Sequence, residues 1–205
     1  MRSCFYEYKN ITAKKPSLLS APINFAQMKY GVDPSTITLK PIKVTFFEMH
    51  ERPLSFHENP RVEFRSLQKP ITADTYLFFY SEVGRQHFWL DRIVMGESEL
   101  LKLINAADIG IFAMYIDDQP SGYAEFIVRE KYTEILYFGL MPAFIGKGFG
   151  KYALDWAINK AWSYNPQWIQ LNTCELDHPH AIENYRARGF KEVRTEIHQR
   201  KVIAK

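Results

Sequence analysis

The segment from Tyr137 to Gly150 limits the possible fold most, because three glycines join an apolar run to a helical pattern. The apolar run ends at Pro142, the glycines follow at positions 146, 148 and 150, and a helix is expected from Lys151 to Trp162. A strand, a glycine turn and a helix start in this order predict a pyrophosphate site. Glycines allow close backbone approach, and the first-turn amides of a helix point at a bound anion.

Two common phosphate-binding motifs do not match this segment. A P-loop needs Ser or Thr after Gly-Lys, whereas Gly148 follows Gly146-Lys147. A dinucleotide fingerprint needs Gly-x-Gly-x-x-Gly and a later acid, but the spacing differs and Asp177 lies in another strand–loop unit. A tight turn without any ligand therefore remains an alternative for the glycines taken alone.

The chain after this helix adds a second pattern. Trp168–Cys174 alternates as a half-buried strand. A short helix is then expected, capped by Asp177 or His178, with Pro179 near its first position and Gly189 after its last turn.

These two regions resemble the GCN5-related N-acetyltransferase (GNAT) superfamily. The family's acyl-CoA signature, Gln/Arg-x-x-Gly-x-Gly/Ala, is matched at both glycines of Ile145-Gly-Lys-Gly-Phe-Gly150, while Ile145 departs from the first position. The second signature, Ala-x-x-x-Tyr-x-x-x-Gly-Phe, is found from Ala181 to Phe190. The resemblance covers Ile37 to Thr195 and is strong from Ala124 onward.

The order of elements predicts an α+β fold with one main domain. Strand segments are expected in Thr36–Met49, broken near Pro41, and loops from Glu51 to Pro70. Helices are expected at Ala73–Val83 and at Ser98–Asn105, the latter capped by Ser98. A meander of Ile109–Ile116, Gly122–Arg129 and Thr133–Leu140, with a hairpin turn at Asp117–Gly122, precedes the β-α-β-α part. The resemblance implies a GNAT-like mixed, mostly antiparallel sheet, with splayed central strands flanked by helices. Residues 1–35 are expected to form an N-terminal extension to a domain of residues 36–205.

Composition narrows the possible partners. The net charge of +3 is too small to indicate nucleic-acid binding. No apolar run reaches the ~18 residues of a membrane span, and a signal peptide's apolar region is absent. Cys4 and Cys174 lie far apart in sequence and form no Cys-x-x-Cys pair, so the sequence indicates neither a disulfide framework nor a zinc cluster. We expect a cytoplasmic protein, monomeric or homodimeric, that binds no membrane, nucleic acid or metal.

The resemblance implies acetyl-CoA as the co-substrate, held by the glycine turn and its flanks. The backbone N–H of Leu140 is expected to stabilise the thioester oxyanion where the fourth strand splays from the fifth. The positions expected to bind acetyl-CoA are Phe138, Leu140, Met141, Ile145, Gly146, Lys147, Gly148, Phe149, Gly150, Lys151, Asn172, His178 and Tyr185.

Acid–base groups are also implied by the resemblance. Glu134 and Glu125 are rival candidates for the base that deprotonates the amine, and either could be a simple surface carboxylate. Tyr185 is expected to donate a hydrogen bond or proton to the departing thiolate. His178 could equally be a helix cap on the surface. Cys174 is expected to be a buried small residue rather than a nucleophile.

The resemblance also implies that Trp89, Asp91 and Arg92 belong to the acceptor side, where an acid beside aromatic rings would suit a cationic amine. A packed aromatic loop is the alternative. The resemblance therefore implies acetyl transfer from acetyl-CoA to the primary amine of a small molecule. A protein or peptide N-acetyltransferase and a non-catalytic CoA-binding module are the alternatives.

Overall fold

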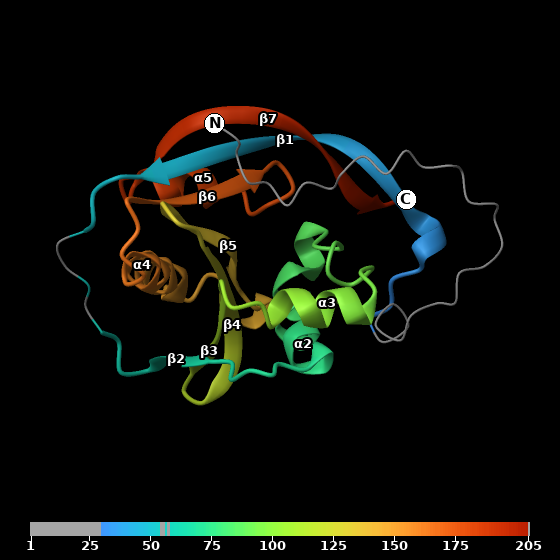
Figure 1. The fold of residues 1–205 in the computed structure, drawn as a ribbon, viewed down its shortest axis with the longest axis horizontal. Helices are drawn as coiled ribbons and strands as arrows, with labels where there is room; N and C mark the ends of the chain where they lie inside the picture. Colours follow the sequence, from blue (N-terminus) through green and yellow to red (C-terminus); the bar gives the residue numbers. More distant parts are fainter. Residues whose placement is uncertain (1–29, 54–55, 57, 205) are drawn as a thin grey trace.

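The computed structural model describes residues 30–53, 56 and 58–204. Within these residues seven strands form one sheet in the order β2-β3-β4-β5-β6-β1-β7 (Figure 1). The strands are β1 (Ile37–Met49), β2 (Val62–Ser66), β3 (Ile109–Ile116), β4 (Gln119–Val128), β5 (Tyr132–Leu140), β6 (Trp168–Cys174) and β7 (Lys191–Ile203). The helices are η1 (Pro34–Thr36), α2 (Ala73–Gly84), η2 (Arg85–His87), α3 (Glu97–Ile104), η3 (Pro142–Phe144), α4 (Phe149–Trp162) and α5 (Ala181–Arg186).

The sheet is mixed and mostly antiparallel, which confirms the predicted fold class. β3, β4 and β5 form the antiparallel meander, and the β5–β6 pair is the parallel one within the described residues. The strands expected at Ile109–Ile116 and Trp168–Cys174 have the predicted bounds. The hairpin turn is shorter than expected, because β4 already begins at Gln119 after Asp117 and Asp118, both in the left-handed region.

Helices pack on both faces of this sheet, so the central strand β4 is buried on both sides. α2 and α3 cover one face, where Tyr76 and Tyr80 join a core cluster with Tyr123. α4 covers the other, where Ala157 packs with Phe126 of β4. Since successive side chains of a strand point to opposite faces, β4 supplies apolar residues to both clusters.

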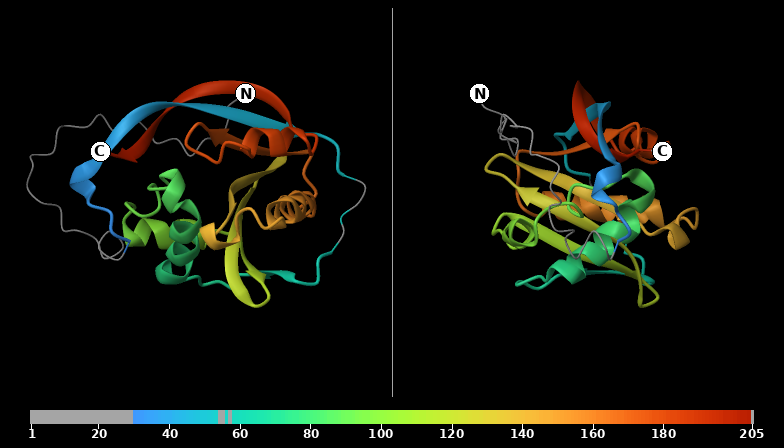
Figure 2. Two further views of the ribbon diagram at one scale, coloured as in Figure 1. Left: turned by 180° about the vertical axis from the view of Figure 1, so that it is seen from behind. Right: turned by 90° about the vertical axis from the view of Figure 1, so that its right-hand side faces the viewer.

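The first strand of the described chain lies among the last ones. β1 pairs antiparallel with β6 on one side and with β7 on the other, and the β1–β7 ribbon arches over the rest of the sheet (Figure 2). The predicted break near Pro41 is wrong, because β1 runs unbroken through it. β6 pairs with β1 from Val44 onward, so Pro41 needs no N–H on that side.

Two further local predictions are corrected by the structure. The region from Glu51 to Pro70 contains strand β2. A long strand, β7, follows Phe190, where no element was predicted. Ser98 does not cap α3: the cap residue is Gly96, in extended backbone conformation, and Glu97 and Glu99 favour the positive end of the helix dipole instead.

The start of α5 also differs from its prediction. The helix begins at Ala181 after His180, with no side-chain cap. Asp177 instead closes the turn after β6, where its Oδ2 accepts hydrogen bonds from the Thr173 hydroxyl at 2.8 Å and the Cys174 amide at 3.0 Å.

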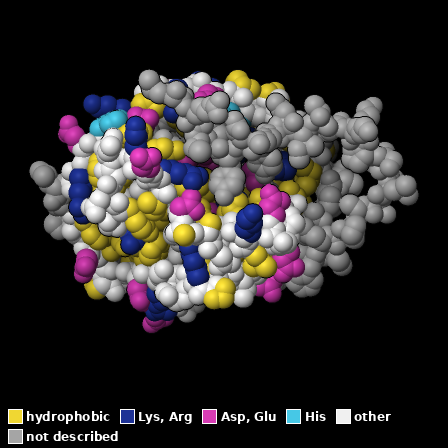
Figure 3. Space-filling view, viewed as in Figure 1, with side chains coloured by type: hydrophobic (Ala, Val, Ile, Leu, Met, Phe, Trp, Pro, Cys, Tyr) yellow, Lys and Arg dark blue, Asp and Glu magenta, His cyan; other side chains and the backbone are white. Residues whose placement is uncertain are grey.

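Two residues that precede the expected boundary at residue 36 contact the core. Val32 is buried in the cluster under α2 and α3, and Tyr30 packs against that cluster. Residues 1–29, including Cys4, lie outside the described residues. On the face shown in Figure 3, acidic and basic side chains of the described residues are interspersed. No helix among the described residues is long and apolar enough to span a membrane.

Candidate active site

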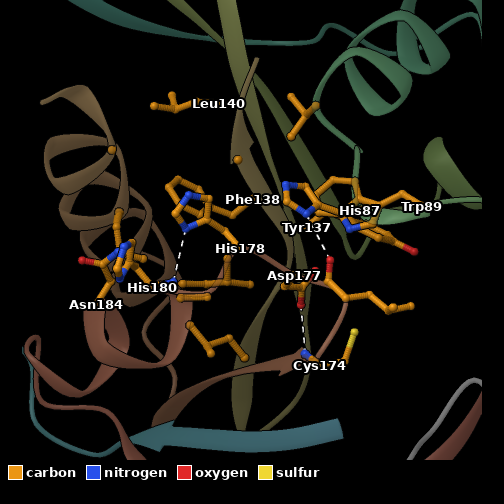
Figure 4. A pocket seen from close by; sticks show the side chains of 18 of the residues that line it. His87, Trp89, Tyr137, Phe138, Leu140, Cys174, Asp177, His178, His180 and Asn184 are labelled. Carbon is orange, nitrogen blue, oxygen red and sulfur yellow. Dashed lines mark hydrogen bonds between the residues drawn. The ribbon is translucent and has the colours of Figure 1, made fainter. Parts of the chain in front are cut away.

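One cavity of about 480 Å³ opens between β5 and the segment from β6 to α5. Figure 4 shows its walls: His87, Trp89 and Tyr137 on one side, His178, His180 and Asn184 on the other, and Leu140 and Phe138 along β5. The glycine turn before α4 and residues of β7 complete the lining.

The cavity exists because β5 and β6 separate. They pair only where Tyr132–Ile135 runs beside Trp168–Leu171. Directly after this, the β4–β5 register shifts so that Leu136 is an extra residue on β5. Such a bulge bends its strand. The expected splay of the two strands is therefore present, and it begins at Leu136.

The amide of Leu140 faces the gap. The Met141 amide donates to the carbonyl oxygen of Ser121 at 2.7 Å, so Met141 and Ser121 form a hydrogen-bonded pair of the β4–β5 ladder. Hydrogen-bonded and non-bonded pairs alternate in an antiparallel ladder. The neighbouring Leu140–Gly122 pair is thus non-bonded, and the N–H of Leu140 points away from β4 toward the opening.

The glycine turn leaves the N-terminus of α4 open. Gly146 and Gly148 have φ of +78° and +85°, a region that side chains rarely adopt, and a Cβ on either would meet nothing within 4 Å. Gly148 is the N-cap of α4, and no side chain caps the helix there. The first-turn amides and the dipole therefore favour an anion at this point. Gly150 is different, because it has ordinary helical backbone.

Tyr185 lies on the cavity wall with its ring held from behind. Its ring centroid is 6.0 Å from that of Phe47 and 6.1 Å from that of Phe190, both buried. Burial, followed by the negative charge of Asp177, raises the pKa of the Tyr185 phenol well above its usual value. The hydroxyl thus stays protonated and can donate a hydrogen bond into the cavity.

Glu125 does not line the cavity. It is fully buried, and its carboxylate accepts a hydrogen bond from the Tyr76 hydroxyl at 2.7 Å and pairs with Arg92 at 3.3 Å. Burial raises the pKa of Glu125, and the Arg92 charge and these hydrogen bonds oppose the rise. These contacts connect the α2–α3 segment to β4, so Glu125 has a structural role in this arrangement.

Glu134 lies where β5 and β6 are still paired, just before the gap. Its two carboxylate oxygens accept hydrogen bonds from the amides of Gln170 and Asn172, each at 3.2 Å. Burial raises the pKa of Glu134, and the bond from Gln170 acts against this. Glu134 does not line the cavity itself, but Asn172 does.

On the expected acceptor side, Trp89 and Asp91 line the cavity and Arg92 is buried behind it. The Trp89 ring packs against Tyr137 with centroids 4.9 Å apart. Gly84 makes room for this ring, because a Cβ on Gly84 would lie 2.4 Å from that of Trp89. Asp91 is already paired with basic side chains of β7, which weakens its attraction for a cationic amine.

Most of the predicted site residues meet in this one cavity. Those that line it are Trp89, Asp91, Phe138, Leu140, Ile145, Gly146, Gly148, Gly150, Lys151, Asn172, His178 and Tyr185. Those outside the lining are Arg92, Glu125, Glu134, Met141, Lys147 and Phe149. Cys174 is half-buried and lines the cavity, so its predicted burial is wrong. The described residues contain no cluster of three or more His, Cys, Asp or Glu side chains suited to a metal ion.

Sequence reasoning missed His87, which also lines the cavity. Its Nδ1 lies 3.1 Å from the carbonyl oxygen of Leu176. A carbonyl only accepts, so Nδ1 is the donor and Nε2 keeps its lone pair in the neutral ring. Its position in an aromatic, polar segment after a helix was the available signal, but only the contact with Leu176 reveals the tautomer.

It also missed Arg200 and Lys201, two lining residues of β7. No strand was expected after Phe190, so nothing in the local pattern directed these side chains toward the cavity. Their position depends on the pairing of β7 with β1.

Comparisons with known proteins show the family and the fold of this chain. The sequence model of the Acetyltransferase (GNAT) family matches residues 71–190. No curated protein matches the chain in sequence. A solved structure of a conserved protein of unknown function from Staphylococcus epidermidis superimposes with a TM-score of 0.55 at 17% identity, covering 87% of this chain and 68% of that one.

Two similar structures are named as GCN5-related N-acetyltransferases. The one from Sphaerobacter thermophilus has a TM-score of 0.54 at 13% identity, covering 80% of this chain and 53% of that one. The one from Kribbella flavida has a TM-score of 0.53 at 16% identity, covering 85% and 63%. The chain thus spans less than two thirds of these two proteins, and the likeness concerns the fold.

Proposed function

Since this chain belongs to the acetyltransferase (GNAT) family, we propose that it transfers an acetyl group from acetyl-CoA to the primary amine of a small molecule. One observation carries the proposal: a single cavity joins the open N-terminus of α4 to the gap beside Leu140, where an amide points away from its neighbouring strand. This arrangement supports an anion site and an oxyanion donor within one continuous space.

In this proposal the glycine turn holds the pyrophosphate of acetyl-CoA. The amides around Gly146 and Gly148 supply hydrogen bonds, and Lys151 adds a positive charge on the cavity wall. Lys147 and Phe149 flank the turn outside the lining, and the Lys147 ammonium lies 5.5 Å from the centre of the Phe144 ring. The pantetheine arm then runs into the gap between β5 and β6, where the pairing of these two strands has ended.

The reaction we propose is a direct transfer. The lone pair of the amine attacks the thioester carbon, and the N–H of Leu140 stabilises the negative oxygen that forms. The C–S bond breaks as the tetrahedral intermediate collapses. Coenzyme A leaves as a thiolate that accepts a hydrogen bond or proton from Tyr185, and the amine gives up one proton to a base.

We propose His87 as that base, with Glu134 as the second candidate. His87 lines the cavity, and its bond to Leu176 leaves the Nε2 lone pair available. Glu134 reaches the cavity only through Asn172, whose amide it binds. Glu125 is a weaker candidate, because Tyr76 and Arg92 occupy its carboxylate away from the cavity.

A small acceptor is favoured by the walls of the acceptor end. Trp89, Tyr137 and Tyr80 form an aromatic cluster on one side, with ring centroids 4.9 to 5.6 Å apart, and β7 residues lie on the other. A protein N-terminus or lysine is the alternative acceptor. A cytoplasmic location and a monomeric or homodimeric state stay predictions.

Acetyl transfer is tested by incubating the protein with acetyl-CoA and a panel of primary amines and peptides, with products identified by mass spectrometry. Acetylated small amines are the expected products. Acetylated peptides alone would establish the alternative acceptor class. Binding of acetyl-CoA without any transfer would instead indicate a non-catalytic module.

The binding site is tested by calorimetry on Gly148→Glu. A carboxylate at the α4 N-terminus should abolish measurable acetyl-CoA binding through charge repulsion and occupation of the anion position. Gly189→Glu is the matched control, because Gly189 has φ of +92°, an open Cβ position and no place in the cavity lining. Equal affinities of the two variants would remove the pyrophosphate from this turn.

A further inference from the structure

The wall of the cavity that β7 forms carries more positive than negative charge. Arg200 and Lys201 are consecutive residues of β7, and both line the cavity. Both face the same carboxylate: Lys201 Nζ lies 2.6 Å from Asp91 Oδ1, and Arg200 Nη1 lies 3.6 Å from Asp91 Oδ2. One acidic side chain thus faces two basic ones.

The neighbouring strand increases this imbalance. In the β1–β7 ladder Lys40 lies directly opposite Arg200. Like charges at directly opposed positions of a sheet destabilise it. Packing alone does not favour such an arrangement, whereas an anion bound nearby would offset the repulsion.

Arg200 also has an unused hydrogen-bond donor. Its Nε is buried and has no hydrogen-bond acceptor among the described residues, while its Nη1 is beyond hydrogen-bond distance of Asp91. A buried donor without an acceptor destabilises the folded protein. The planar guanidinium binds a carboxylate or phosphate through two parallel N–H donors, so this group suits an anionic oxygen ligand.

The basic pair lies at the acceptor end of the cavity. Asp91, its partner, follows the Trp89 wall in the α2–α3 connection, whereas the glycine turn belongs to the α4 side. Cys174, the last residue of β6, lines the same cavity as Arg200. Burial raises the pKa of its thiol, and the charge of Arg200 opposes this rise. Figure 4 shows Cys174 at the far end of the cavity from Leu140.

We propose that the acceptor is an amine that also carries a carboxylate or phosphate group, and that Arg200, with Lys201, binds this anionic group. The proposal rests on the acetyl transfer proposed above. Lys201 stays paired with Asp91 and contributes its positive charge, while the N–H donors of the Arg200 guanidinium bind the anion. The amine end of the acceptor then faces the thioester beside Leu140.

The test compares acceptors that share an amine and differ in charge: β-alanine against β-alaninamide, and phosphoethanolamine against ethanolamine. The wild-type protein should prefer an anionic member in kcat/KM. Arg200→Gln should lower that preference by roughly 30-fold or more through KM, because a charged hydrogen-bond partner is lost. Arg200→Lys should restore part of it. The KM for acetyl-CoA should not change.

Lys191→Gln is the matched control. It removes one positive charge from the exposed start of β7, outside the cavity lining, and should leave the preference unchanged. Asp91→Asn should change acceptor binding in opposite directions for an anionic acceptor and for a cationic one. It frees both basic side chains, so the affinity for the anionic acceptor should rise. If Asp91 bound a cationic amine instead, this variant would weaken acceptor binding and overturn the proposal.

The remaining outcomes are distinct. Equal kcat/KM for the two members of both pairs in the wild type, or an unchanged preference in Arg200→Gln, would overturn the anionic acceptor. Failure of the wild type to bind or acetylate any of the four probes would overturn it as well. None of these results would affect the acetyl transfer itself, which fails only if the protein neither binds acetyl-CoA nor acetylates any amine.

Discussion

Tyr185 combines two properties at the scale of a single residue. Its ring is fixed between Phe47 and Phe190, and its hydroxyl belongs to the cavity wall. Because its pKa is raised, the phenol is a poor proton donor but a stable hydrogen-bond donor at neutral pH. Within the proposed mechanism, Tyr185 therefore stabilises the departing thiolate by a hydrogen bond.

Tyr185→Phe should lower kcat by about 100-fold, at the low end of the range for acid–base groups. Its affinity for acetyl-CoA should stay within about twofold, because the ring contacts with Phe47 and Phe190 remain. Steady-state kinetics and calorimetry measure the two effects. Tyr164→Phe, a half-buried tyrosine outside the cavity lining, is the control. An unaltered kcat would remove Tyr185 from the mechanism.

The base can be identified from the kinetics of two variants. His87→Gln removes the Nε2 lone pair and should lower kcat/KM by about 100-fold if His87 is the base. Glu134→Gln should then have a much smaller effect on the rate.

Glu134 would leave a different signature. Its pKa is raised, so as a base it would ionise, and the rate would rise, only above the usual carboxyl range. If Glu134→Gln lost this rise and most of the rate while His87→Gln kept both, the carboxylate would be the base.

At the scale of elements, the course of β5 decides where the site lies. The bulge at Leu136 turns β5 away from β6, and the non-bonded Leu140–Gly122 pair directs an amide into the gap. Gly122 permits this close pairing, because a Cβ there would lie 2.4 Å from the backbone oxygen of Gly139. A backbone atom cannot move aside as a flexible side chain can.

Gly122→Ala should therefore destabilise the protein by about 1 to 3 kcal/mol, as overpacking does, and should lower acetyl transfer by displacing Leu140. Chemical denaturation and kinetics measure these effects. Gly110→Ala in β3 is the matched control, since its Cβ would meet only the end of the Tyr164 side chain, at 2.7 Å. Wild-type stability and rate in Gly122→Ala would show that β5 tolerates a shift at Leu140.

At the scale of the whole molecule, the first described strand lies inside the sheet, between two strands from the end of the chain. β1 separates β6 from β7, and its side chains Val44, Phe46, Phe47 and Met49 are buried. β7 is thereby held in position to supply Arg200 and Lys201 to the cavity. The described N-terminal part is thus needed to build the acceptor end of the proposed site.

Two deletions test this arrangement and the proposed domain boundary. Removing residues 1–29 should keep the midpoint of thermal unfolding within about 4 °C of the full chain, which corresponds to roughly 1 kcal/mol. Removing residues 1–49 should prevent folding. Burial of each of the four β1 side chains named above stabilises the fold by about 1.5 to 3 kcal/mol, and their sum is comparable to the whole free energy of unfolding of a domain. Circular dichroism of both variants provides the measurement, and a folded, active 50–205 chain would contradict the role of β1.

Local sequence patterns predict much of the fold and the part of the candidate site around the glycine turn. The strands Ile109–Ile116 and Trp168–Cys174, the helix after the glycine turn and the positive-φ positions Gly146 and Gly148 depend on neighbours a few residues away. Such features are encoded in the periodicity and backbone freedom of the residues themselves.

The positions of the residues in the other part of the candidate site, near His87 and β7, depend on the tertiary structure. The position of β1 between β6 and β7, the tautomer of His87 and the direction of Arg200 arise from contacts between distant parts of the chain. A strand's own pattern does not specify its partner, because pairing is selected by packing and burial across the whole sheet. For the same reason Glu125, which the sequence allowed to be a surface carboxylate, is buried in the structure and contacts Arg92.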